Sequence, residues 1–279
     1  MITDAQVHLW DVDRLDRPWP KPVPNQPHRP DGFSAEQMLP YMDAAGVDRA
    51  VIVPPTWSGD SNDTALQAHA AYPSRFAVMG RFNPMTPDAP DRLETWLQQP
   101  GMLGIRMTFR VSPFKEWLED DTLDWFWAAC ERLQIPLMVL VAGVPGKMLP
   151  VAARHPGLKL TIDHMGCELE KHAAAAFVGI DDLLALAKYP NVTVKTSSAP
   201  CFSAAPYPYR DIYDYLRSIY DAFGPRRMLW GADLTRLTST YEECLSHFQD
   251  GLDFLSAEDK EWVLGKSAAT VLGWPETPA

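Results

Sequence analysis

The sequence lacks the features that mark several classes of protein. No apolar run approaches the length of a membrane-spanning helix, and no basic segment followed by an apolar stretch opens the chain, so we expect neither a membrane anchor nor a signal peptide. Positive charge is scarce, because 25 Lys and Arg residues face 36 Asp and Glu residues. The formal net charge of −11 argues against nucleic acid or an anionic membrane as a partner.

Cysteine is also rare, and no nucleotide-binding or serine-hydrolase motif is present. The four cysteines (Cys130, Cys167, Cys201 and Cys244) show neither a CxxC pair nor a zinc-type Cys–His spacing, so we expect reduced thiols in a cytoplasmic protein. The chain has no Gly-rich dinucleotide fingerprint, no P-loop and no GxSxG elbow. These absences remove the commonest α/β cofactor enzymes and esterases from consideration.

Short apolar strands alternate with amphipathic helices along the whole chain. Residues 2–9 alternate with a period of two, which predicts a first strand that ends with Gln6 and His8 pointing the same way. Further strands are predicted at 49–54, 76–80, 102–107, 136–141, 158–162, 192–195 and 228–231. Helical patterns follow at 35–45, 62–72, 87–98, 122–133, 147–155, 181–188, 209–223, 241–250 and 258–272. Eight βα units favour an α/β fold with a single (β/α)8 TIM barrel domain over residues 1–279.

One segment breaks this alternation. Residues 11–33 carry six prolines, which exclude a helix and disfavour a central strand. Because this loop leaves the C-terminal end of the first strand, it is either a wall or lid over an active site or a Pro-rich strap on the surface.

Polar residues recur where the predicted strands end, which is where (β/α)8 barrels carry their chemistry. They are Gln6, His8, Arg81, Asn83, Arg106, Thr108, Arg110, Asp163, His164, Lys195, Thr196, Ser197, Ser198 and Asp233. So many ionisable groups at one end of a barrel indicate a functional site.

Three motifs among them resemble those of the amidohydrolase superfamily. They are Asp4-x-x-x-His8-Leu9-Trp10, 162–166 (Ile-Asp-His-Met-Gly) and 230–233 (Trp-Gly-Ala-Asp). More narrowly, nearly the whole chain resembles the amidohydrolase-2 group of lactonases and decarboxylases, which includes 2-pyrone-4,6-dicarboxylate lactonase. The resemblance implies the barrel fold and a small-molecule substrate.

The resemblance also bears on whether the protein binds a divalent metal. The family often holds a divalent metal with His-x-His on strand 1, His on strands 5 and 6, and Asp on strand 8. Here Gln6 replaces the first His and strand 5 offers none, which leaves His8, His164 and Asp233. Since a neutral amide is a poor zinc ligand and the resembling lactonases work without metal, we expect no metal cofactor.

The remaining residues predict a mechanism of lactone hydrolysis. Asp233 would be the general base that activates water, while His8, His164 and the amide of Gln6 would polarise the scissile carbonyl. Substrate-binding residues are predicted as Arg106, Arg110 and Lys195 for a substrate carboxylate, and Trp10, Trp57 and Tyr207 for an apolar wall.

Several alternatives stay open. Lys195 could instead neutralise Asp233 or Asp163. Asp163 is expected to orient His164 and not to be the base. His28 is expected not to reach the site. A metal-dependent decarboxylase or hydrolase would hold Zn²⁺ or Mn²⁺ at His8, His164 and Asp233. A non-catalytic barrel that binds a small acid is the third hypothesis. Both a monomer and a homodimer are compatible with the sequence.

Overall fold

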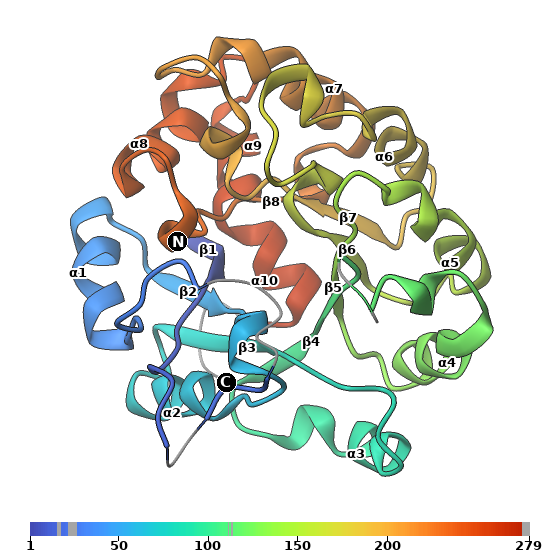
Figure 1. Cartoon of the computed structure of the whole chain (residues 1–279). Helices are drawn as coiled ribbons and strands as arrows, with labels where there is room; N and C mark the ends of the chain where they lie inside the picture. Colours follow the sequence, from blue (N-terminus) through green and yellow to red (C-terminus); the bar gives the residue numbers. More distant parts are fainter. Residues whose placement is uncertain (16–17, 22–26, 111, 113, 275–279) are drawn as a thin grey trace.

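Eight parallel strands form one sheet whose spatial order follows the chain, as the computed structural model shows (Figure 1). The structure describes residues 1–15, 18–21, 27–110, 112 and 114–274. The strands are β1 (Thr3–Val7), β2 (Arg49–Ile52), β3 (Phe76–Gly80), β4 (Met102–Thr108), β5 (Leu137–Leu140), β6 (Leu160–Ile162), β7 (Val192–Lys195) and β8 (Met228–Leu229). Backbone hydrogen bonds from Ala5 N to Trp230 O (3.0 Å) and from Asp233 N to Gln6 O (2.8 Å) join β1 to the segment after β8. The predicted (β/α)8 barrel is confirmed.

Helices surround this barrel on the outside (Figure 1). They are α1 (Ala35–Ala45), α2 (Asp63–Ala71), α3 (Ala89–Glu94), α4 (Asp124–Arg132), α5 (Leu149–Arg154), α6 (Ile180–Leu186), α7 (Tyr213–Phe223), α8 (Tyr241–Ser246), α9 (Ala257–Glu261) and α10 (Ser267–Leu272). The first begins and ends as its sequence predicts: Ser34 and Gln37 form a capping box, and Gly46 adopts the left-handed conformation after the last turn.

The last helix closes the end of the barrel where the strands begin. Ala268 and Leu272 of α10 pack against inward-facing residues such as Val51 and Met138. Arg49, at the start of β2, donates to the Trp274 carbonyl (3.0 Å) and lies over the Trp274 ring. Because α10 covers this end (Figure 1), only the opposite end, where the strands finish, can admit a substrate.

The C-terminal helices differ from the prediction. The helix expected at 241–250 ends in a π-helical turn, His247–Gly251, and the helix expected at 258–272 is interrupted by another, Trp262–Lys266. In the second turn Gly265 lies so close to the N-terminal chain that an added Cβ would lie 2.1 Å from Met1 O. An extra residue in a turn leaves the apolar pattern almost unchanged, so the sequence pattern did not reveal it.

Two further findings bear on the sequence expectations. Among the described residues, no helix is long and apolar enough to cross a bilayer. All four cysteines are buried and none is paired in a disulfide.

Candidate active site

Three neighbouring strand ends carry residues in an unusual backbone conformation. His164 after β6, Ser198 after β7 and Asp233 after β8 have φ of 50°, 57° and 55°. Residues other than glycine adopt such angles infrequently, and they concentrate where the surrounding structure enforces a functional geometry. All three side chains converge at the open end of the barrel.

Asp233 lies at the centre of this group and is almost fully buried. Its Oδ1 is 3.4 Å from His8 Nε2, its Oδ2 is 3.8 Å from His164 Nε2, and Ser198 Oγ donates to Oδ2 (3.2 Å). Burial by itself would raise the pKa of Asp233, but the neighbouring imidazoles and Arg236 outweigh it and hold that pKa below its ordinary value. Oδ1 has no hydrogen-bond partner among the described residues. Asp233 is therefore an ionised carboxylate with one oxygen available to accept a proton.

His8 is held as a neutral ring by its neighbours. Its Nδ1 lies 2.6 Å from the Val53 carbonyl, which can only accept, so Nδ1 carries the proton. Its Nε2 therefore offers a lone pair, and Gln6 Nε2 lies 3.1 Å from it. Burial lowers the pKa of His8 to about 4, although Asp233 opposes the shift. In this state His8 Nε2 carries no proton to donate to a substrate carbonyl, and one of the two amide protons of Gln6 is directed to His8.

His164 is oriented differently from the expectation. Its Nδ1 shares a hydrogen bond with Ser197 Oγ (2.8 Å), so a serine of the next strand end, and not Asp163, sets its ring. Burial lowers the pKa of His164 to about 3, against the opposing charges of Asp233 and Asp163. The ring is neutral near pH 7, with Nε2 facing Asp233.

Asp163 instead anchors two cations inside the barrel. Lys195 Nζ lies 2.7 Å from Asp163 Oδ1, and Arg106 Nε donates to Oδ2 (3.0 Å). Lys195 is fully buried and also donates to Gln6 Oε1 (2.6 Å). Of the alternatives for Lys195, the structure supports an ion pair within the barrel, and with Asp163 as the partner. Lys195 is not among the described residues that line the cavity.

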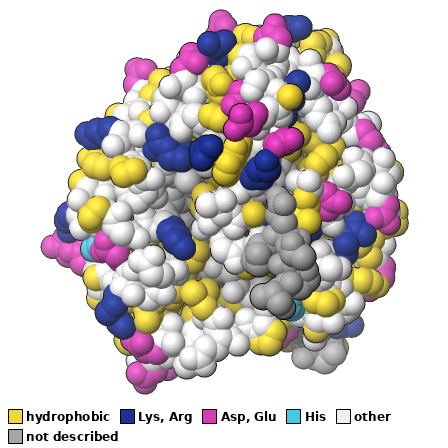
Figure 2. All heavy atoms as spheres, turned by 180° about the vertical axis from the view of Figure 1, so that it is seen from behind, with side chains coloured by type: hydrophobic (Ala, Val, Ile, Leu, Met, Phe, Trp, Pro, Cys, Tyr) yellow, Lys and Arg dark blue, Asp and Glu magenta, His cyan; other side chains and the backbone are white. Residues whose placement is uncertain are grey.

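A cavity of about 450 Å³ opens above these groups. It is lined by His8, His28, Pro55, Thr56, Trp57, Arg106, Thr108, Arg110, Leu140, His164, Leu169, Glu170, Asp233 and Arg236. Three arginines form a basic side, and Arg110 at the rim forms an ion pair with the exposed Glu170. Figure 2 shows the face seen from behind, with Lys and Arg side chains gathered around its middle. This basic side suits an acidic ligand.

The Pro-rich segment contributes the opposite, aromatic side. A two-way backbone bridge between Trp10 and Phe33 (3.0 and 2.9 Å) ties the ends of the segment together. His28 from its middle reaches into the cavity, with its ring centroid 4.8 Å from that of Trp57 and 5.7 Å from that of His8. Its Nδ1 shares a hydrogen bond with Thr235 Oγ1 (2.9 Å). His28 of this segment thus lines the site, and the expectation that it would not reach the site is wrong. Residues 16–17 and 22–26 of the segment lie outside the described part.

The other predicted residues divide between the cavity and its surroundings. Trp57 lines the cavity, whereas Trp10 is buried behind it and meets Trp57 edge to face. Tyr207 lies elsewhere: it is 41% exposed and packs on Tyr209, so we remove it from the candidate site. Arg236 was missed, although a cation three residues after the 230–233 motif is a signal that could have found it.

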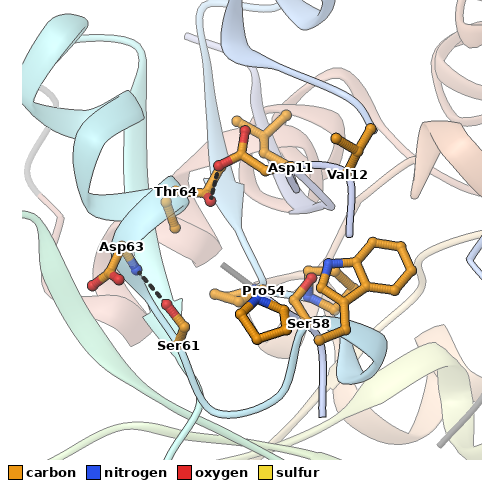
Figure 3. A pocket seen from close by; sticks show the side chains of 12 residues that line it. Asp11, Val12, Pro54, Ser58, Ser61, Asp63 and Thr64 are labelled. Atoms are coloured by element: carbon orange, nitrogen blue, oxygen red, sulfur yellow. Dashed lines mark hydrogen bonds between the residues drawn. The ribbon is translucent and has the colours of Figure 1, made fainter. Parts of the chain in front are cut away.

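A second, smaller hollow of about 190 Å³ lies beside the start of the Pro-rich segment (Figure 3). Among its labelled residues, Thr64 Oγ1 donates to Asp11 Oδ2 (3.2 Å) and Asp63 N donates to Ser61 Oγ (3.3 Å). Its described lining holds two carboxylates and neither His nor Arg, so it does not suit an acidic substrate.

The residues at the site do not fit a divalent metal well. Among the described residues, no three His, Cys, Asp or Glu side chains are grouped so as to hold one. The Nε2 lone pair of His8, which a metal would need, faces the amide of Gln6. The ammonium of Lys195, on the other side of that amide, adds an unfavourable positive charge.

Comparisons with known proteins show the family of the chain and agree with its fold. The sequence model of the Amidohydrolase (Amidohydro_2) family matches residues 3–274. An L-fucono-1,5-lactonase from Burkholderia ambifaria is 28% identical over 82% of this chain and 79% of its own length. A 4-sulfomuconolactone hydrolase from Rhizobium radiobacter is 24% identical over 75% of this chain and 68% of its own. Among solved structures, an amidohydrolase from Burkholderia multivorans with bound zinc is similar in fold, with a TM-score of 0.80 and 21% identity over 99% of this chain and 100% of that one.

Proposed function

The chain belongs to the amidohydrolase-2 family, and on this premise we propose that it is a hydrolase that opens a lactone bearing an acid group, with Asp233 as the base. The observation that carries the proposal is the buried, ionised Asp233, which lines the cavity and whose Oδ1 has no hydrogen-bond partner among the described residues. Two relatives named as lactone hydrolases support the reaction class.

In the proposed reaction, Asp233 accepts one proton from water and later donates it to the leaving group. Asp233 Oδ1 accepts a proton from a water molecule while the water oxygen bonds to the lactone carbonyl carbon. Arg106 and His164 are the donors best situated for the oxyanion that forms. When the bond between the carbonyl carbon and the ring oxygen breaks, Asp233 returns its proton to the leaving alkoxide. The product is an open-chain hydroxy acid, and Asp233 is ionised again.

The acid group of the substrate is proposed from the charge of the cavity. Arg106, Arg110 and Arg236 all line it, and Arg236 Nη1 is buried without a hydrogen-bond partner among the described residues. Arg106 is held rigidly by Asp163 and by Thr108 Oγ1 (2.5 Å). A carboxylate or sulfonate on the lactone would meet these guanidinium groups, while the ring would lie against Trp57 and His28.

The test compares acidic and neutral lactones on one protein. We expect faster hydrolysis of a muconolactone-type acid than of L-fucono-1,5-lactone, with the same rate before and after treatment with a chelator. An Arg236→Gln variant should lose the preference for the acid and keep its rate on the neutral lactone. Activity lost to the chelator and restored by zinc would contradict the metal-free mechanism and favour the metal-dependent alternative. Tight binding of the acid without any turnover would favour the non-catalytic alternative.

A further inference from the structure

Lys195 is a cation with every donor engaged inside the protein. Its ammonium contacts Asp163 Oδ1 (2.7 Å), Gln6 Oε1 (2.6 Å) and Met138 Sδ (3.2 Å). An ammonium has three donors and no acceptor, so these contacts account for all of them. A thioether is a weak acceptor, and its presence as the third partner indicates a tightly enclosed position with no better partner at hand. A charge buried in this way acts on the site through its electric field and through the neighbours that it orients.

The neighbour that matters is Gln6. Because Lys195 can only donate, the atom of Gln6 that faces it is the amide oxygen, and the amide nitrogen is then directed to His8 Nε2 at 3.1 Å. On the far side of the ring, Val53 O requires a proton on Nδ1. The two requirements agree: both leave His8 neutral with the Nε2 lone pair taken by Gln6.

An ion pair followed by two hydrogen bonds therefore links three strand ends beneath the cavity. It begins at Asp163 after β6, passes through Lys195 of β7 and Gln6 of β1, and ends on the ring of His8. Its positive charge lies beneath the face on which Asp233 and the two imidazoles converge.

We propose that Lys195 is a positioning residue and the fixed internal cation of this site, where it takes the place of a divalent metal. It acts by orienting Gln6, so that the amide nitrogen of Gln6 donates to the Nε2 lone pair of His8. The kinetic part of this proposal rests on the proposed lactone hydrolysis; the structural part does not. It assigns Lys195 a role that differs from direct binding of a substrate carboxylate.

The first test uses the unaltered protein and needs no substrate. With nitrogen-15 in the Gln and His side chains, NMR should show a proton on His8 Nδ1, an unprotonated Nε2, and a nitrogen–nitrogen coupling across the Gln6–His8 hydrogen bond. A His8 ring protonated at Nε2, without that coupling, would overturn the proposal.

The second test asks whether the lysine keeps metal out. Zinc binding is measured by calorimetry and metal analysis for the unaltered protein, Gln6→His, and Gln6→His combined with Lys195→Met; Gln6→His combined with Lys147→Met is the control. Lys147 is a surface lysine whose partner is Glu119 (2.8 Å). We expect no stoichiometric zinc in the unaltered protein, and roughly 10- to 100-fold tighter binding in the Lys195 double variant than in Gln6→His or the control. Equal zinc affinity in the two double variants would overturn the proposal.

The third readout is kinetic. Lys195→Met should lower kcat on an acidic lactone roughly 10- to 100-fold with little change in KM, because the lysine positions Gln6 and does not touch substrate. A rise in KM alone would overturn the positioning role in favour of substrate binding. If the unaltered protein hydrolyses no lactone, the proposed function fails while the NMR and zinc results still decide this proposal. If Lys195→Met does not fold, the NMR measurement on the unaltered protein decides it.

Discussion

Replacing Asp233 by Asn is the most direct test of the proposed base. The variant keeps the size of the side chain but removes the oxygen that accepts the proton. A positioned general base contributes about 100- to 10,000-fold to a rate, so kcat should fall by that factor, which corresponds to roughly 3–5 kcal/mol of transition-state stabilisation. Among the described residues that line the cavity, the other carboxylate is Glu170, which is exposed and paired with Arg110, so the loss should lie toward the larger value.

The same variant should leave folding nearly unchanged. Residue 233 has φ of 55° and ψ of 50°, and Asn tolerates this left-handed conformation about as well as Asp, whereas Ala would add strain of about 1–2 kcal/mol. Asn can also still accept the hydrogen bond from Ser198 Oγ. Urea unfolding should therefore show a change within about 1 kcal/mol.

The assay is steady-state hydrolysis of an acidic lactone near pH 7, followed by loss of lactone absorbance. Asp221→Asn is the matched control, because Asp221 is an exposed carboxylate paired with Arg217 (2.9 Å) far from the cavity chemistry. A kcat for Asp233→Asn within about fivefold of that of the unaltered protein, with folding intact, would refute the reasoning that Asp233 is the base.

Three further predictions concern the surroundings of the base. Asp163→Asn leaves two buried cations without a counter-charge, so it should lower the free energy of unfolding, measured in urea, by about 3–5 kcal/mol. The control is Asp124→Asn, in a half-exposed ion pair with Arg154, which should lower that free energy by less than about 1 kcal/mol. His28→Ala removes part of the aromatic wall and should raise KM more than it lowers kcat; an unchanged KM would show that the wall does not contact substrate. Stability should fall steeply on acidification between about pH 6 and 4.5, by roughly 3 kcal/mol per pH unit, measured as urea midpoints across that range. Burial lowers the pKa of His8 (about 4), His164 (about 3) and His247 (about 4), and also that of His28, so unfolding in this range takes up at least three protons. Burial raises the pKa of Asp4 to about 7, so unfolding releases one proton from that carboxyl. A stability that is flat or that rises on acidification would contradict these assignments.

Features that depend on neighbouring residues were predicted from the sequence, whereas a feature that depends on distant parts of the chain was not. The capping box at Ser34 and the glycine that ends α1 are written in neighbouring residues, and both were predicted correctly. The strands at 76–80 and 192–195 were predicted to the residue, because an apolar run bounded by turn residues suffices to define a buried strand. The π-turn at Trp262–Lys266 was not predicted, and it lies where the N-terminal chain approaches Gly265.

The candidate site shows the same division. Residue type and position at strand ends were enough to single out His8, His164, Asp233 and Arg106, since a parallel barrel brings all its strand ends to one face. The sequence did not determine which carboxylate pairs with Lys195, because Lys195 could face either Asp163 or Asp233. Only the register of β6 against β7 places it beside Asp163.

The amino-acid sequence by itself determined the barrel, its active face and the residue types gathered there, because periodicity and strand order are properties of the chain. The tertiary structure alone decided which side chains meet. It brought His28 from the Pro-rich segment over His8, moved Tyr207 away from the cavity, and set Gln6 between Lys195 and His8. Such contacts join residues up to 189 positions apart, and their geometry depends on packing that no local pattern encodes.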